Sequence, residues 1–129
     1  MSQSALWAVM RAYNLPEIDL LEAIYSRTTA CMDPKDVRCA TITFLTGVIQ
    51  GGASSPGIFV VFINALLEHL TCTGQALGIS HSIAGTEQFN NVAFMDDITA
   101  VEQENAGAQI LLNATQEFEA WSNTRLIFS

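Results

Sequence analysis

The chain has 129 residues and carries five Lys plus Arg against thirteen Asp plus Glu, which gives a formal net charge of −8. Half of its residues are apolar and only 14% are charged, which excludes a disordered chain and predicts one globular domain over residues 1–129. The acidic balance also argues against a self-standing basic nucleic-acid binder, because phosphate contacts need clustered Lys and Arg.

The sequence shows no sign of a membrane or secretory protein. Its longest apolar stretch, residues 57–67, is interrupted by Asn64 and is shorter than the roughly 20 residues of a membrane span. No basic region precedes an apolar run near Met1. The cysteines are odd in number and form no C-x-x-C pair, which favours reduced thiols. We therefore expect an intracellular protein, cytoplasmic or nuclear, with no membrane contact.

In the first third of the chain, hydrophobic spacing predicts a helix over residues 5–13 and a second one that begins at Pro16. β-Branched residues then replace the helical pattern after Arg27. Residues 28–32 and 37–45 flank a Pro- and Asp-containing turn, so this segment is predicted to form a hairpin.

A glycine- and serine-rich loop comes next in the chain. It ends at Ser55, a typical N-cap residue, and Pro56, a typical first helical residue. The next helix is apolar around most of its circumference, which predicts burial among neighbours. Residues 71–91 are predicted to be a connection with one short strand around 77–83. A tight hairpin over 91–101, a helix over 106–121 and a final strand over 125–128 complete the prediction.

Asp96 and Asp97 are the strongest chemical signal. Adjacent carboxylates between β-prone apolar arms are costly unless a cation neutralises them, and carboxylate oxygens suit Mg²⁺ or Mn²⁺. The alternative interpretation is that this pair only makes the turn, since Asp favours turns on local grounds. The apolar arms on both sides favour the metal interpretation.

Gln50, Gly51 and Gly52 precede a helix N-terminus, whose amide groups and dipole can meet a phosphate or nucleotide. Glycines at such places often only supply positive-φ geometry, and the segment lacks the P-loop and dinucleotide-binding patterns.

The two histidines, His69 and His81, have no partner at metal-ligand spacing. We expect a capping or surface role for both.

The order of these signals resembles the palm of a reverse transcriptase, in particular the non-long-terminal-repeat retrotransposon type. Residues 47–59 are similar to the family segment G-V-x-Q-G-x-x-x-S-P-x-x-F, and residues 93–97, Ala-Phe-Met-Asp-Asp, are similar to its [FY]-x-D-D hairpin. The opening helices and the helix that ends in Glu-Phe-Glu-Ala-Trp-Ser also fit the family order. The resemblance therefore covers nearly the whole chain.

The resemblance implies that Asp96 and Asp97 hold the Mg²⁺ or Mn²⁺ ions of a two-metal nucleotidyl transfer. It implies that Gln50 and Gly51 shape the nucleotide pocket. It also implies that Phe94 packs the hairpin against the long helix and that Met95 lies near the primer end. RNA template, DNA primer and deoxynucleotides are the implied partners of the parent enzyme.

The chain departs from the family pattern at both ends. The family has a further catalytic aspartate on a strand that would precede Met1, and a later strand with a Lys that would follow Ser129; the basic fingers and thumb are absent too. Neither Asp19 nor the turn residues Asp33 and Asp36 are expected to replace that aspartate. The missing parts would come from flanking sequence or from another chain.

The predicted fold class is α+β, a partial polymerase palm with a small antiparallel sheet and helices packed on one of its faces. The predicted function is that of a fragment of an RNA-directed DNA polymerase, inactive as an isolated chain. Two alternatives stay open: a non-catalytic retrotransposon remnant or protein-interaction module with a palm-like fold, and a translated piece of a longer polymerase that never exists alone.

Overall fold

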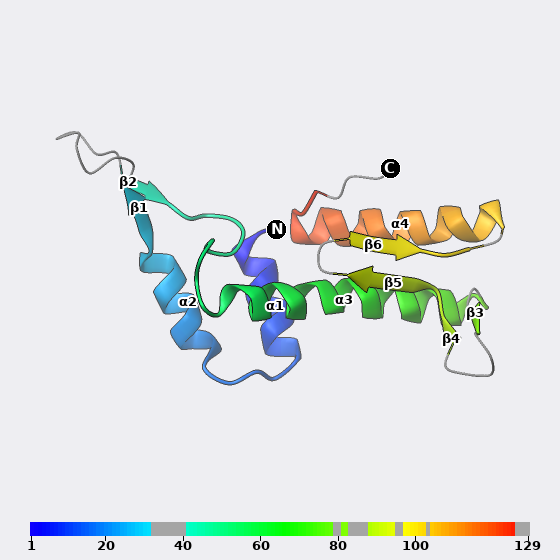
Figure 1. Cartoon of the computed structure of the whole chain (residues 1–129), viewed down its shortest axis with the longest axis horizontal. Coiled ribbons are helices and arrows are strands. Elements are labelled where there is room, and N and C mark those ends of the chain that lie inside the picture. The colour runs from blue at the N-terminus through cyan, green and yellow to red at the C-terminus, as the bar shows by residue number, and fades with distance from the viewer. Residues whose placement is uncertain (32–40, 79–80, 83–87, 95–96, 103, 126–129) are drawn as a thin grey trace.

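The computed structural model describes residues 1–31, 41–78, 81–82, 88–94, 97–102 and 104–125, and it combines four helices with short antiparallel strand pairs (Figure 1). The elements follow the order α1 (Gln3–Ala12), α2 (Ile18–Arg27), β1 (Thr29–Cys31), β2 (Thr41–Thr43), α3 (Ser55–Ala76), β3 (His81–Ser82), β4 (Gln88–Phe89), β5 (Asn91–Phe94), β6 (Asp97–Ala100) and α4 (Asn105–Ser122).

The two opening helices are confirmed, with one change at the start of the second. The Ser2 hydroxyl caps α1 by accepting a hydrogen bond from the Ala5 amide at 3.2 Å. Helix α2 begins two residues later than the predicted Pro16 start, because Glu17 adopts a left-handed conformation (φ 59°) and serves as its N-cap. The chain therefore turns at residues 14–17 before the second helix can begin.

Helix α3 is the centre of the core. Its buried residues Ile58, Phe62, Leu66 and Leu70 lie at helical spacing, and α3 packs against both α1 and α4 (Figure 1). The opposite side is open, since Val60 is 63% exposed. The prediction that this helix lies among neighbours is therefore confirmed, although the side of α3 that carries Val60 is open in the described structure.

Helix α3 is also longer than predicted, because residues 71–76 continue the helix and do not form part of a connection. The hydroxyls of Thr71 and Thr73 each donate to the carbonyl four residues earlier at 2.8 Å, which lets these residues stay helical. By length and composition alone the 22-residue helix could span a membrane, as core helices of soluble proteins also could, and 33% of its most apolar window is buried within the structure.

The strands pair as antiparallel ladders of two: β1 with β2, β3 with β4, and β5 with β6. The hairpins predicted at residues 28–45 and 91–101 are thereby confirmed, with a turn at residues 33–36 that lies outside the described residues. Mixed helices and antiparallel strands also confirm the α+β class. The described strands form separate ladders, however, so one sheet with helices packed on a single face is not what this part of the chain shows.

The beginning of the chain is held between two distant segments. The Ser2 amide donates to the carbonyl of Ser122 at 2.7 Å, and the Gly47 amide donates to the carbonyl of Met1 at 3.0 Å. Helix α4 ends as Asn123 turns left-handed (φ 52°), which confirms the predicted helix and its stop. The final strand predicted over residues 125–128 falls almost entirely outside the described residues.

Candidate functional site

The β5–β6 hairpin carries the predicted catalytic carboxylates. Phe94 pairs with Asp97 and Asn91 with Ala100, which leaves residues 95 and 96 as the connection between the strands. Asp97 opens β6 and is exposed. Met95 and Asp96 lie outside the described residues, as does the side chain of Phe94, so their predicted roles stay predictions. The strand register places the exposed Asp97 at one end of the hairpin, and Asp96 precedes it in the sequence.

Two asparagines fasten this hairpin to α3. Asn90 is 1% exposed, and its Nδ2 donates to the Leu70 carbonyl at 2.8 Å. Nδ2 of Asn91 donates to Oγ1 of Thr71 at 3.0 Å. The Asn90 carbonyl accepts from the Val101 amide at 2.8 Å, which closes the open end of the hairpin. We call Asn90 and Asn91 the asparagine latch; sequence reasoning missed it.

The loop before α3 places Gln50 and Gly51 at the surface. Gly51 has φ +81°, where an L side chain would be strained, and nothing lies within 4 Å of the Cβ position it lacks. The Ser55 side chain is buried, and its hydroxyl donates to the Ile49 carbonyl at 2.6 Å. This hydrogen bond holds the loop against the start of α3. Ser55 is the first residue of α3, so the N-cap position predicted for Ser55 is occupied by Ser54.

Gly52 is required for steric reasons, because a Cβ there would lie 2.7 Å from the Ser55 hydroxyl and 3.3 Å from the Ile49 carbonyl. We expect Gly52→Ala to break the Ser55–Ile49 hydrogen bond and to cost about 1–2 kcal/mol in urea unfolding. Gly57→Ala is the matched control, since nothing lies within 4 Å of its missing Cβ. Equal stability of the two variants would contradict this account of the loop.

The loop and the hairpin lie along the same helix. Strand β5 runs back along α3, so that the strand ends at Phe94 and Asp97 point toward the side on which α3 begins (Figure 1). Gln50 and Gly51 lie just before that beginning. Among the described residues no hydrogen bond joins loop and hairpin, so α3 and the asparagine latch set their relative position.

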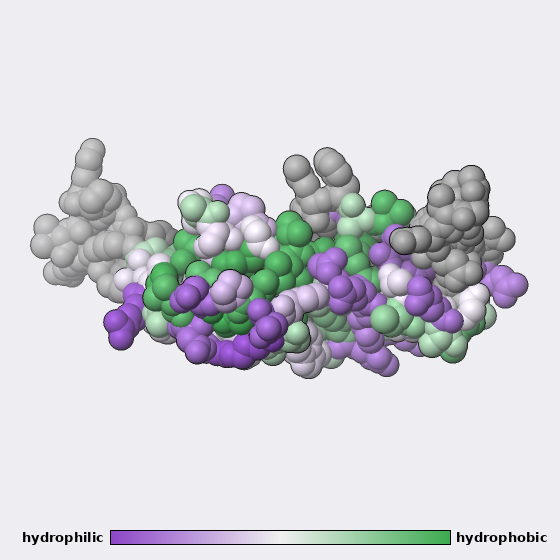
Figure 2. All heavy atoms as spheres, turned by 90° about the horizontal axis from the view of Figure 1, so that it is seen from below, coloured by the Kyte–Doolittle hydropathy of each residue, from purple (hydrophilic) through white to green (hydrophobic). Residues whose placement is uncertain are grey.

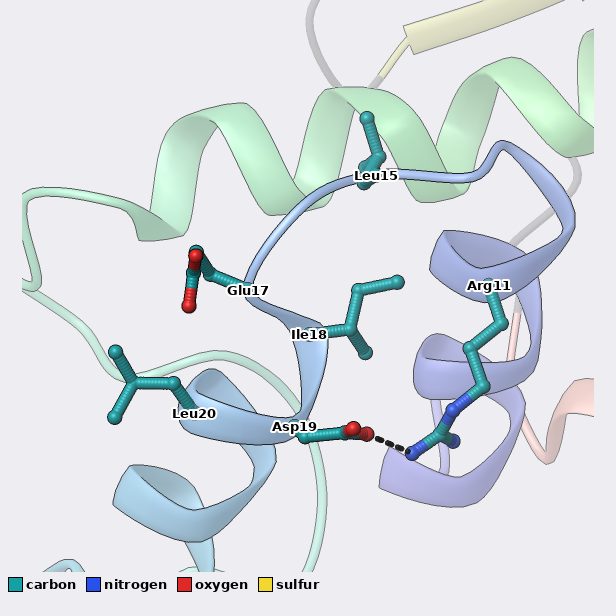
Figure 3. Close-up of a pocket in the computed structure, with 6 residues that line it drawn as sticks. All are labelled: Arg11, Leu15, Glu17, Ile18, Asp19 and Leu20. Carbon is teal, nitrogen blue, oxygen red and sulfur yellow. Dashed lines mark hydrogen bonds and ion pairs between the residues drawn. The ribbon is translucent and has the colours of Figure 1, made fainter.

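Asp19 belongs to a different place, a pocket where α1 meets α2. Its carboxylate forms an ion pair with Arg11 at 3.1 Å (Figure 3). Arg11 also pairs with Glu22. Hydrogen bonds to the Glu22 and Asp19 carboxylates raise the Arg11 pKa above its ordinary value. Asp19 thus lies on a helix, as predicted, and pairs with Arg11 at the corner between α1 and α2.

His69 differs from the sequence prediction. It lines a pocket between helices, and its Nε2 is buried without a hydrogen-bond partner among the described residues, so it neither caps the helix nor lies free on the surface. His81 opens β3, within the strand predicted around residues 77–83; its side chain lies outside the described residues, so its expected role stays a prediction. Nearby on α3, Asn64 donates to the Tyr13 hydroxyl at 3.0 Å; partial burial and a hydrogen bond to Glu68 raise the Tyr13 pKa.

Within the described part of the chain, no three His, Cys, Asp or Glu side chains converge as a metal site. Of the two predicted metal ligands, Asp97 is described and is exposed at a strand end, whereas Asp96 lies outside the described residues. The thiol of Cys72 is free and exposed; Cys39 lies outside the described residues.

Comparisons with protein-family models, with curated proteins and with solved structures found no match.

Proposed function

We propose that the chain is part of the palm of an RNA-directed DNA polymerase of the non-long-terminal-repeat type. The observation that carries the proposal is the tight β5–β6 hairpin with Asp97 at its strand end, which lies along the helix that follows the Gln50–Gly51 loop. Both motifs of the family resemblance thus come from one helix-and-hairpin unit. That arrangement suits a site where a nucleotide meets a metal-binding carboxylate pair.

In this proposal each of the predicted site residues has a separate role. Asp96 and Asp97 would hold Mg²⁺ or Mn²⁺, which in such sites neutralises charge developing on the reacting phosphate. Gly51 would let a nucleotide approach the backbone closely, because it has no side chain and open space beside it. Gln50 would contact the nucleotide or template, and Phe94 with Met95 would shape the primer side of the hairpin.

We expect the isolated chain to bind Mn²⁺ weakly, with a Kd on the order of 1 mM, because it contributes only two carboxylates. Asp97→Asn and Asp96→Asn should each weaken binding about tenfold, a change of about 1.4 kcal/mol. Water-proton relaxation during a Mn²⁺ titration measures this affinity directly.

The control for that titration is Glu104→Gln, which removes an equal charge at an exposed position just before α4. It should bind Mn²⁺ like the unaltered protein. Equal affinity of the unaltered protein and both Asp variants would exclude the carboxylate pair as the metal site. Primer extension by the chain alone would contradict the expectation that it is inactive.

A second candidate function, a non-catalytic interaction module, is favoured by the apolar surface. Figure 2 shows apolar residues gathered in one area over the α1–α2 side of the molecule. Leu20 and Ile24 of α2 are 56% and 48% exposed, and Val60 of α3 is more exposed still. Contiguous apolar surface of this kind often marks a contact with another protein or domain. Unchanged Mn²⁺ binding in the Asp variants would favour this alternative.

A further inference from the structure

A second, apolar pocket of about 380 Å³ lies between α1, α3 and α4. Its lining residues are Val9, Ala65, His69, Glu117, Phe118 and Trp121. The volume falls within the range of small-molecule sites, which are mostly apolar and contain a few polar groups. None of these residues belongs to the loop or the hairpin, so this pocket is distinct from the proposed polymerase site.

The aromatic part of the lining comes from one face of α4. Trp121 is 54% exposed, and its ring contacts that of the buried Phe118 with centroids 5.5 Å apart. Because the Trp121 indole is half exposed beside the pocket, a ligand can contact a large aromatic surface there. Binding costs little conformational entropy, because only two side-chain torsions must be fixed. A planar or cationic group can therefore bind against Trp121.

The polar part of the lining is incomplete. Nε2 of His69 is buried and has no hydrogen-bond partner among the described residues. A buried polar atom without a partner is uncommon in folded proteins and is disfavoured, so it points to a group that the described chain does not supply. His69 lines the pocket, but Nε2 itself is buried, so the ring must turn before this atom can reach a ligand there.

The charge in the lining is negative. Glu117 is exposed and precedes Trp121 by four residues, so the carboxylate and the indole lie on the same side of α4. The protein as a whole carries a net charge of −8, which attracts cations toward it. A ligand that satisfies this lining has an apolar body and a positively charged end that donates hydrogen bonds.

We propose that this pocket binds a small organic ammonium ion with an aromatic or aliphatic body. Val9, Ala65 and Phe118 would enclose the body, while Glu117 and Trp121 would receive the ammonium group. His69 would accept a hydrogen bond after its ring turns about the Cβ–Cγ bond, a torsion with broad, roughly two-fold preferences. The pocket does not depend on the polymerase proposal and could be occupied in either function.

The test uses 2-phenylethylammonium chloride as the probe and the indole N–H signals of the two tryptophans as the readout. Trp7 is 4% exposed in the core, so its signal serves as an internal reference for Trp121. We expect a saturable shift of the Trp121 signal with a Kd on the order of 1 mM, as befits a ligand of this size. The absence of a saturable shift would overturn the proposal.

Two comparison ligands and two variants test the chemistry. Uncharged 2-phenylethanol and the small ethylammonium ion should each bind more weakly than the probe. Glu117→Gln should weaken probe binding about threefold to fivefold, as expected for an exposed ion pair. Glu119→Gln, which removes the same charge outside the lining, should leave it unchanged. Equal binding of 2-phenylethanol, or equal weakening by both variants, would overturn the proposal.

Discussion

Phe62→Ala is expected to destabilise the fold by about 3–5 kcal/mol, the largest effect of any single change considered. Phe62 is 1% exposed in the middle of α3, and its ring contacts that of Phe118 on α4 with centroids 5.4 Å apart. The substitution removes this aromatic contact and leaves a cavity where α3 and α4 meet. Domains are stable by roughly 5–15 kcal/mol, so the variant should be close to unfolding.

Urea unfolding followed by far-ultraviolet circular dichroism measures this loss, and Val60→Ala is the matched control. Val60 lies two residues away on α3 but is 63% exposed, so its truncation should cost less than about 0.5 kcal/mol. If the two variants unfolded at the same urea concentration, α3 would not be the centre of the core.

The second large effect is expected for Asn90→Ala, which removes the buried half of the asparagine latch. The substitution takes away the hydrogen bond to the Leu70 carbonyl and leaves a cavity beside it, at a cost of about 2–3 kcal/mol. Because Asn90 fastens the hairpin and not the helices, amide hydrogen exchange should accelerate more in β5 and β6 than in α4.

Asn64→Ala provides the control for Asn90→Ala. Asn64 also donates side-chain hydrogen bonds, to Tyr13 and Glu68, but it is exposed, so its loss should cost less than about 1 kcal/mol. Uniform acceleration of exchange across β5, β6 and α4 in Asn90→Ala would mean that Asn90 supports the whole core and is not a local latch.

Helices and hairpins with strong local patterns were predictable from the sequence. The periodic apolar residues of α1 and α4 give those helices, and Asn123, which turns left-handed, marks the end of α4. The β-prone apolar arms on both sides of Asp96 and Asp97 indicate the hairpin. These features depend on local chemistry, which a sequence displays directly.

The features that sequence reasoning missed depend on tertiary packing. Thr71 and Thr73 have low helix propensity, yet they remain in α3 because their hydroxyls bond back to the helix and Asn91 bonds to Thr71. The burial of His69 Nε2 in the folded chain is likewise not revealed by any local sequence pattern.

The candidate site was predictable only in its parts. The sequence offered Asp96 and Asp97 as metal ligands and Gln50 with Gly51 as a nucleotide loop, but not the contacts that relate them. Those contacts are made by the buried Ser55, which bonds to the loop, and by the asparagine latch, which bonds the hairpin to α3. The signal of the latch in the sequence is the pair Asn90–Asn91 at the point where β5 begins, because polar side chains there are costly to bury without hydrogen-bond partners.

We propose that the Gln50–Gly51 loop and the Asp96–Asp97 hairpin form one nucleotide site. The decisive experiment is a titration of the isotope-labelled chain with deoxyadenosine triphosphate, followed by backbone amide signals with and without Mg²⁺. We expect saturable, Mg²⁺-dependent shifts at Gly51 and Asp97 together, both lost in Asp97→Asn. Shifts at only one of the two, or at neither, would contradict it.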